Sequence, residues 1–293
     1  MVEIATPRLP AAELERLAAR FPERTIALGG DRRVSVRECG TGHGAELPLV
    51  CLHGIGSGAA SWMETAVLLA QHTRVIAWDA PGYGESTALT MDAPRGVDYA
   101  ERLHALLNAL DIQRCVLVGH SLGALMAAPA VRLDGEGGRF AALVLISPAQ
   151  GYGAEGREAD RERVHAERLN TLARLGIAGM AAQRSTRLVS EHASPVARAW
   201  VQWNMARLHE RGLRQAIELL CGGDLVVDLP PTIPVQVACG ELDVVTSPNA
   251  CAEVARRCNV DLQLIKSAGH ASYVEQPAAV AQLLGRVLSA VQG

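Results

Sequence analysis

Short apolar runs alternate with helix-like segments along most of the chain, and this alternation restricts the possible folds more than any other feature. Six of the runs are almost continuously apolar, which is typical of strands that are buried on both faces of a sheet. They span residues 47–53, 74–79, 115–119, 142–147, 234–240 and 262–266. This pattern predicts an α/β fold with a doubly wound, mostly parallel sheet. Two earlier segments, 25–28 and 33–38, fit an antiparallel hairpin at one edge.

The alternation stops between Ser147 and Pro234, where the chain holds three helix-like segments and no convincing strand. These segments span residues 160–175, 177–190 and 195–220. We therefore expect the sheet domain to be formed by residues 1–147 and 234–293, with a helical cap inserted at residues 148–233. A length of 293 residues suits one core that carries a large insertion.

Composition excludes several classes of function. A net charge of −3 predicts no basic surface for nucleic acid or for an anionic membrane. No run reaches the ~18 apolar residues of a spanning helix, and residues 1–22 lack the pattern of a secretory signal. The seven cysteines form no CxxC pair or Cys/His metal pattern. We expect a soluble, cytoplasmic protein with no metal and no organic cofactor, a small molecule as its substrate, and no nucleic-acid or membrane partner.

Two further properties carry less information. Lys266 is the only lysine beside many arginines, a bias that fits a GC-rich bacterial genome. The sequence leaves open whether the chain forms a homo-oligomer.

The motif Gly119-His120-Ser121-Leu122-Gly123 is the strongest chemical signal, because it follows an apolar strand and runs directly into an alanine-rich helix. In such a tight turn the glycines relieve crowding, and the helix N-terminus favours developing negative charge. The alternative, an unreactive turn of small residues, fits this context less well. The motif predicts Ser121 as a nucleophile.

A serine nucleophile needs a base, and His270 is the histidine best placed to provide it. His270 lies in the loop after the run at 262–266, and the carboxyl ends of parallel strands are where ligands bind. Its alternative role is that of a solvated loop histidine. Asp243, after the run at 234–240, is expected to orient the base, with Glu241 as the competing acid. The chain order Ser, Asp, His is the one expected for this type of fold.

The loop His53–Gly58 is rich in glycine, which lets the backbone approach a ligand closely. We expect the N–H groups of Leu122 and Ile55 to form an oxyanion hole. Gly54, Gly56 and His120 are candidates to line the substrate pocket beside them.

The predicted cap supplies further candidates. Trp200, Trp203 and Met205 are expected either to line an apolar acyl site or to pack the cap onto the core. Arg184 and Arg187 are either partners for a substrate carboxylate or ordinary surface arginines.

Together these motifs resemble the α/β-hydrolase superfamily along nearly the whole predicted sheet domain. The matching segments are HGIGSG (53–58), DAPGYGES (79–86), GHSLG (119–123), GELD (240–243) and GHASYVEQP (269–277). The resemblance implies an acyl-enzyme route, in which Ser121 attacks a carbonyl, His270 shuttles the proton and water releases the acid. It also implies that Asp79 is a structural turn residue.

Within the superfamily, the chain is similar to small-molecule esterases and enol-lactonases, and also to carbon–carbon bond hydrolases of aromatic ring-cleavage products. The last group typically has an aromatic residue after the histidine, where this chain has Ala271. Haloalkane dehalogenases and epoxide hydrolases have Asp where this chain has Ser121. The sequence therefore predicts hydrolysis of a carboxylic ester or lactone. Carbon–carbon cleavage of a diketone acid and a small-molecule receptor that retains the triad are the alternatives.

Overall fold

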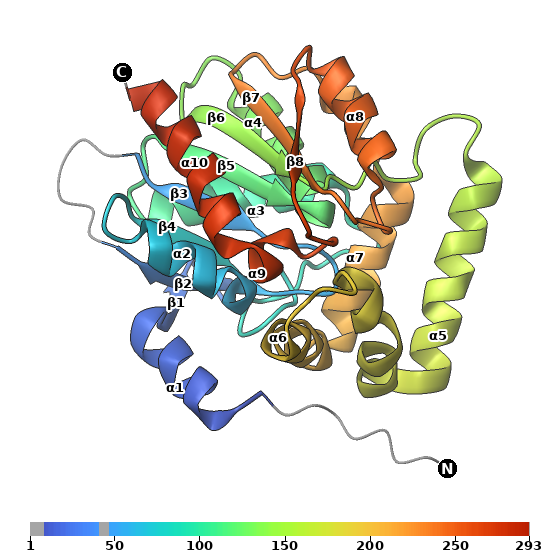
Figure 1. Ribbon diagram of the computed structural model, residues 1–293. Coiled ribbons are helices and arrows are strands. Elements are labelled where there is room, and N and C mark those ends of the chain that lie inside the picture. Colours follow the sequence, from blue (N-terminus) through green and yellow to red (C-terminus); the bar gives the residue numbers. More distant parts are fainter. Residues whose placement is uncertain (1–8, 41–46, 293) are drawn as a thin grey trace.

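The computed structural model describes residues 9–40 and 47–292, and an eight-stranded sheet forms its centre (Figure 1). The strands are β1 (Glu23–Ala27), β2 (Arg33–Cys39), β3 (Leu49–Leu52), β4 (Val75–Trp78), β5 (Cys115–His120), β6 (Phe140–Ile146), β7 (Val235–Gly240) and β8 (Leu262–Ile265). Their order is β1-β2-β4-β3-β5-β6-β7-β8. β1 pairs antiparallel with β2, and β2 with β4, whereas the pairs from β4 to β8 are parallel. The predicted fold class and the edge hairpin are confirmed.

Helices cover both faces of the sheet. They are α1 (Ala11–Arg20), α2 (Met63–Leu69), α3 (Gly96–Ala109), α4 (Ala124–Asp134), α8 (Pro248–Arg257), α9 (Ser272–Glu275) and α10 (Pro277–Gln292). Residues of β3 show the two-sided burial directly, because Leu49 and Cys51 pack with α2 and α10, while Val50 and Leu52 pack with α3 and α4. A strand with alternate residues in two separate cores must be apolar throughout, which explains the continuous apolar runs.

Between β6 and β7 the chain forms α5 (Glu158–Arg184), α6 (Pro195–Ala206) and α7 (Glu210–Gly222). α5 is interrupted at Gly176, whose φ of 63° and ψ of −175° are not helical. The predicted single helix at 195–220 is wrong, because the chain leaves the helical conformation between α6 and α7. His209 there is extended, with φ −96° and ψ 137°, and Leu208 before it is buried. No helix among the described residues is long and apolar enough to cross a membrane.

The sheet delivers the candidate residues to one edge. β5 ends directly before Ser121, β7 ends three residues before Asp243, and β8 is followed by the loop that carries His270. Parallel strands direct their carboxyl ends to the same edge, so these loops converge there. α5, α6 and α7 contribute residues to the same cavity as the loops, as described below.

Candidate active site

Ser121 occupies a strained turn between β5 and α4. Its φ of 52° lies in the left-handed region that a residue with a side chain rarely adopts. Glycines make the turn possible. A Cβ on Gly119 would lie 2.8 Å from the carbonyl oxygen of Gly123, and one on Gly123 would lie 2.6 Å from the carbonyl oxygen of Leu52. The turn places Ser121 in the wall of the cavity, where its side chain is almost fully buried.

His270 and Asp243 form a buried pair, with 2.8 Å between His270 Nδ1 and Asp243 Oδ2. The other carboxylate oxygen, Oδ1, accepts the backbone N–H groups of Val245 at 2.7 Å and Thr246 at 3.0 Å. Burial acts to raise the pKa of Asp243, but the His270 charge and these hydrogen bonds outweigh it and lower the pKa to about 2. The carboxylate is therefore ionised at neutral pH, as a partner for an imidazolium must be.

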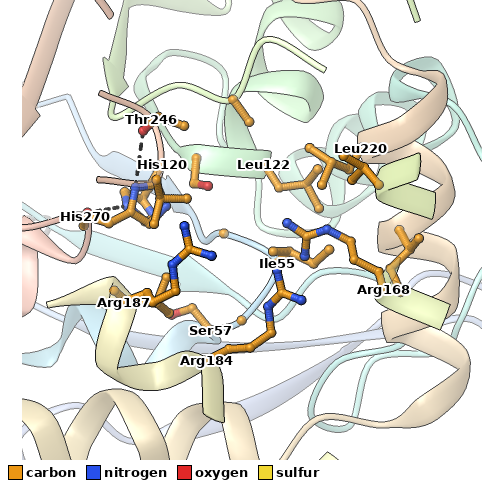
Figure 2. A pocket seen from close by; sticks show the side chains of 18 of the residues that line it. Ile55, Ser57, His120, Leu122, Arg168, Arg184, Arg187, Leu220, Thr246 and His270 are labelled. Atoms are coloured by element: carbon orange, nitrogen blue, oxygen red, sulfur yellow. Dashed lines mark hydrogen bonds between the residues drawn. The ribbon is translucent and has the colours of Figure 1, made fainter. Parts of the chain in front are cut away.

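Thr246 joins this pair and was not predicted from the sequence. Its Oγ1 lies 2.9 Å from Asp243 Oδ2, 3.2 Å from His270 Nδ1 and 3.0 Å from the carbonyl oxygen of Ser147 (Figure 2). The hydroxyl thus holds the carboxylate against the end of β6. The only sequence signal was its position three residues after Asp243, because a short loop brings such a residue back to the carboxylate.

Glu241, the competing acid, lies away from the imidazole. It is paired with Lys266, at 2.6 Å from Oε1 to Nζ, and it accepts the backbone N–H of Ser267 at 3.1 Å. The structure therefore brings Asp243, and not Glu241, into contact with His270.

The loop after β3 presses its backbone against the serine. A Cβ on Gly54 would lie 2.9 Å from Ser121 Cβ and 3.3 Å from its Oγ. Tyr83 donates its hydroxyl to the carbonyl oxygen of Ile55 at 2.9 Å, which fixes the next peptide of the loop. Among the described residues no acceptor is found for the Ile55 N–H, and Leu122 is the second residue of the 3₁₀ turn Ser121–Gly123, whose first N–H groups have no acceptor within it. Both N–H groups are therefore available to a ligand, and their role in an oxyanion hole stays a prediction.

Asp79 supports the same loop from outside the cavity. Its Oδ1 accepts the N–H of Ala59 at 2.8 Å, and its Oδ2 accepts the hydroxyl of Ser35 at 2.6 Å. These contacts tie β2 to the segment after β3, which agrees with the structural role that the resemblance implies.

His120 lies behind His270, with 4.8 Å between the ring centroids, and its Nε2 donates to the carbonyl oxygen of His270 at 2.9 Å (Figure 2). Burial, and next the His270 charge, lower the pKa of His120 to about 3, so this ring is neutral at pH 7. A neutral ring that donates to the backbone of His270 orients that residue rather than exchanging protons with a substrate.

A cavity of about 410 Å³ opens over Ser121 and His270. Gly54, Gly56, His120 and Met205, which were pocket candidates from the sequence, are among the residues that line it. The volume lies within the range of small-molecule sites.

Trp200 and Trp203 are not among the residues that line this cavity, so of the two roles expected for them the pocket role is not found and the packing role is. The cavity-facing residues of α6 are Val201 and Met205, one turn apart. Trp200 instead packs in the core and donates to Glu13 of α1 at 3.3 Å, and Trp203 packs under the Arg207 guanidinium. The two tryptophans therefore fasten α6 to the rest of the protein.

Arginines dominate the charged lining of the cavity. Figure 2 shows Arg168, Arg184 and Arg187 directed into it. Arg184 and Arg187 were candidates from the sequence, whereas Arg168 was not singled out. The helical pattern of residues 160–175 places Arg168 on α5 but does not reveal which face of α5 meets the sheet domain.

The chain belongs to the alpha/beta hydrolase family, whose profile matches residues 49–283. This match covers the sheet from β3 to β8 together with the inserted helices. Hydrolase activity is thereby supported, while the substrate is not specified.

Solved structures share the fold at low sequence identity. A thermophilic esterase from Thermogutta terrifontis, with malate bound, superimposes with a TM-score of 0.78 at 23% identity, covering 92% of this chain and 99% of that one. The enol-lactonase from Burkholderia xenovorans LB400 also gives 0.78, at 20% identity, covering 90% of this chain and 99% of the other.

Among curated relatives, the (E)-2-((N-methylformamido)methylene)succinate hydrolase of Acinetobacter baylyi is 34% identical over 103 residues, which are 35% of this chain and 37% of the relative. The chain aligns with less than half the length of the first curated relatives that it matches.

Proposed function

We propose that the protein is a serine hydrolase that cleaves a carboxylic ester or lactone of a small molecule through an acyl-enzyme on Ser121. One observation carries the proposal: the buried Asp243–His270 pair and the strained Ser121 line or adjoin the same cavity, beside two free backbone donors. This is the combination that acyl transfer requires of a protein without a metal.

In the proposed reaction, Ser121 Oγ attacks the carbonyl carbon of the substrate while His270 Nε2 takes the hydroxyl proton. The carbonyl oxygen becomes negatively charged and accepts hydrogen bonds from the N–H groups of Ile55 and Leu122. The intermediate then expels the alcohol oxygen, which takes the proton from His270. Water, deprotonated by the same histidine, attacks the acyl-enzyme, and the bond to Ser121 Oγ breaks as the histidine returns that proton to the serine, which releases the carboxylic acid. Asp243 keeps Nδ1 protonated and stabilises the imidazolium in both halves.

Two considerations favour an ester or lactone over a carbon–carbon bond. Ala271 stands where carbon–carbon hydrolases typically carry an aromatic residue, and it is buried beside the histidine. An esterase and an enol-lactonase are among the proteins that share the fold over their whole length. Carbon–carbon cleavage of a diketone acid is the alternative, and direct assay of such an acid beside the esters separates the two.

The test is hydrolysis of p-nitrophenyl butyrate by the purified protein and by Ser121→Ala. Removal of the nucleophile in an enzyme of this type lowers the rate by roughly 10⁴- to 10⁶-fold. Ser289→Ala, on the exposed face of α10, serves as the control and should leave the rate unchanged. Near-parental activity of Ser121→Ala would overturn the assignment. A single stoichiometric burst by the parent, with no further turnover, would favour a receptor.

A further inference from the structure

Arg168 is a cation in the wall of the cavity that has no partner within the described part of the chain. Its Nε is sealed from solvent and makes no hydrogen bond, and no ion pair is found for its guanidinium. Burial, and next the charge of Arg184, lower the pKa of Arg168 to about 10. The side chain as a whole is half-buried, but an N–H donor that is sealed from water without an acceptor destabilises the folded protein.

Two other arginines of the cavity, Arg157 and Arg163, differ in this respect, whereas the exposed Arg187 likewise has no ion pair among the described residues. Arg163 is paired with Asp160 at 2.9 Å, and Arg157 lies over the Tyr152 ring and donates to the Gly151 carbonyl at 2.9 Å. These side chains are satisfied by the protein itself. Arg157 holds the loop after β6, whereas the pair of Arg163 and Asp160 lies within α5.

Arg184 lies close enough to Arg168 for the two charges to repel each other. Its only ion pair among the described residues is a long one, 3.5 Å from Nη1 to Oε1 of Glu167. The Glu167 side chain is half exposed, and such a pair contributes little. Two neighbouring guanidiniums with one distant carboxylate leave an excess of positive charge at this point of the wall.

The position of the two arginines relates them to the reacting carbonyl. Figure 2 shows Arg168 on the side of Leu122 and Leu220, near Ile55, with Arg184 beside it and Arg187 on the side of His270. Arg168 lines the same cavity as Ile55 and Leu122, whose N–H groups form the proposed oxyanion hole. A group bound at Arg168 would therefore belong to the molecule whose carbonyl enters the oxyanion hole.

We propose that Arg168 and Arg184 together bind a carboxylate of the substrate, so that the natural substrate is an ester or lactone that also carries a free acid group. A carboxylate offers two oxygens that match the parallel N–H donors of a guanidinium, and it would neutralise the repulsion between the two arginines. This inference rests on the proposed function, because it names the class of substrate for the same site.

The experiment compares acidic and neutral esters with the same leaving group. The acidic substrates are the mono-p-nitrophenyl esters of succinic, glutaric and adipic acid, and the neutral substrate is p-nitrophenyl butyrate. kcat/KM is measured for the parent, Arg168→Gln, Arg168→Lys and Arg174→Gln. Arg174 is the matched control, since it lies exposed on the same helix and outside the cavity.

We expect the parent to prefer at least one acidic ester over the butyrate. Arg168→Gln should lower kcat/KM for that ester by about 10- to 100-fold, the usual range for a lost charge-assisted hydrogen bond, and change the butyrate rate less than threefold. Arg168→Lys should retain part of the preference, because it keeps the charge without the fork. Arg174→Gln should behave as the parent.

The proposal is supported if Arg168→Gln loses the preference for the acidic ester and Arg174→Gln keeps it. No preference in the parent, or a preference that survives in Arg168→Gln, overturns it while the butyrate rate still reports a working hydrolase. Failure of the proposed function gives a different result, because Ser121→Ala would then leave the hydrolysis of every ester unchanged or no ester would be hydrolysed at all.

Calorimetric titration of Ser121→Ala separates a carboxylate site from a general anion site. We expect binding of succinate and its loss in Ser121→Ala combined with Arg168→Gln. Tighter binding of inorganic phosphate than of succinate, lost in the same variant, would overturn the assignment to a carboxylate.

Discussion

Asp243 and Glu241 lie two residues apart, yet only one carboxylate reaches the imidazole. Asp243→Asn should therefore lower kcat by ~10⁴-fold, because the amide cannot hold the histidine tautomer or stabilise its charge. Glu241→Gln should change kcat less than threefold, because it loses only an exposed contact with Lys266. Ester hydrolysis by both variants under the same conditions, with circular dichroism to verify folding, checks the expectation. If kcat falls ~10⁴-fold in Glu241→Gln and stays near the parental value in Asp243→Asn, Glu241 is the acid and the assignment is reversed.

The lack of a partner for Arg168 among the described residues leads to a prediction about stability that needs no activity assay. Burial, and next the Arg184 charge, lower the pKa of Arg168 to about 10, so the charged form that is present at pH 7 is destabilised in the folded protein. Arg168→Met should raise the free energy of unfolding by about 1–3 kcal/mol, because an apolar side chain of similar length needs no partner there. Urea unfolding at pH 7 measures this.

The exposed residue Arg174 gives the comparison for that measurement, since Arg174→Met should stay within about 0.5 kcal/mol of the parent. Succinate should raise the stability of the parent and leave Arg168→Met unchanged. A less stable Arg168→Met would mean that the guanidinium already has a partner in the free protein.

At the scale of elements, Glu275 of α9 connects the inserted helices with the loop that carries the histidine. Its Oε2 accepts the N–H and the hydroxyl of Ser190, at 2.9 and 2.6 Å, and its Oε1 accepts the N–H of Gly269 at 2.8 Å. Glu275→Gln replaces one acceptor with a donor that faces these donors. We expect a loss of about 1–3 kcal/mol in unfolding free energy and a roughly tenfold lower kcat, because His270 follows Gly269 directly.

Glu253 on α8 is the control for this variant. It is half-buried at the surface, and within the described part of the chain it pairs only with the nearby Arg256 and Arg257, so Glu253→Gln should change both quantities little. Equal effects of the two substitutions would show that Glu275 acts only as a surface charge and does not position the histidine.

The bounds of a strand or helix could be predicted where residues close to its ends determine them. The apolar runs fixed the strands to within a few residues, and Gly176 separates two helical stretches as its residue type indicates. The end of α6 at Arg207 could not be predicted, because no glycine or proline marks it. α1 also was not predicted, although it carries Glu13, which receives the Trp200 indole.

At the scale of the whole molecule, the residues of the candidate site that follow strands could be predicted from the sequence, whereas those on the inserted helices could not. Ser121, Asp243 and His270 follow strand ends, so a parallel sheet brings them to one edge, and their catalytic roles stay a prediction until Ser121→Ala is measured. No comparable rule places the side chains of the inserted helices. Their side chains meet the cavity according to how each helix is rotated against the sheet domain, which is a property of tertiary packing. This is why the sequence left two roles open for Trp200 and Trp203 and did not single out Arg168.

Buried histidines make the stability of the whole chain dependent on pH. The pKa of His120 is about 3 in the folded protein, lowered by burial and the His270 charge, against 6.5 ordinarily, and burial lowers that of His53 as well. Below pH 6.5 the unfolded chain takes up protons that the folded protein excludes, so stability is complete above pH 6.5 and falls as the pH drops. His120 alone should account for a loss of about 2 kcal/mol between pH 7 and pH 5.

His120→Gln tests this share, because glutamine can still donate to the His270 carbonyl but does not titrate. Urea unfolding at pH 7 and pH 5 should show a decline about 2 kcal/mol smaller than in the parent, with the remainder coming from His53 and other groups. The exposed His192→Gln is the control and should decline as the parent does. Asp243 does not contribute in this window, because its pKa of about 2 confines its loss of stabilisation to the range below about pH 4. An unchanged decline in His120→Gln would mean that this ring takes up a proton within the folded protein.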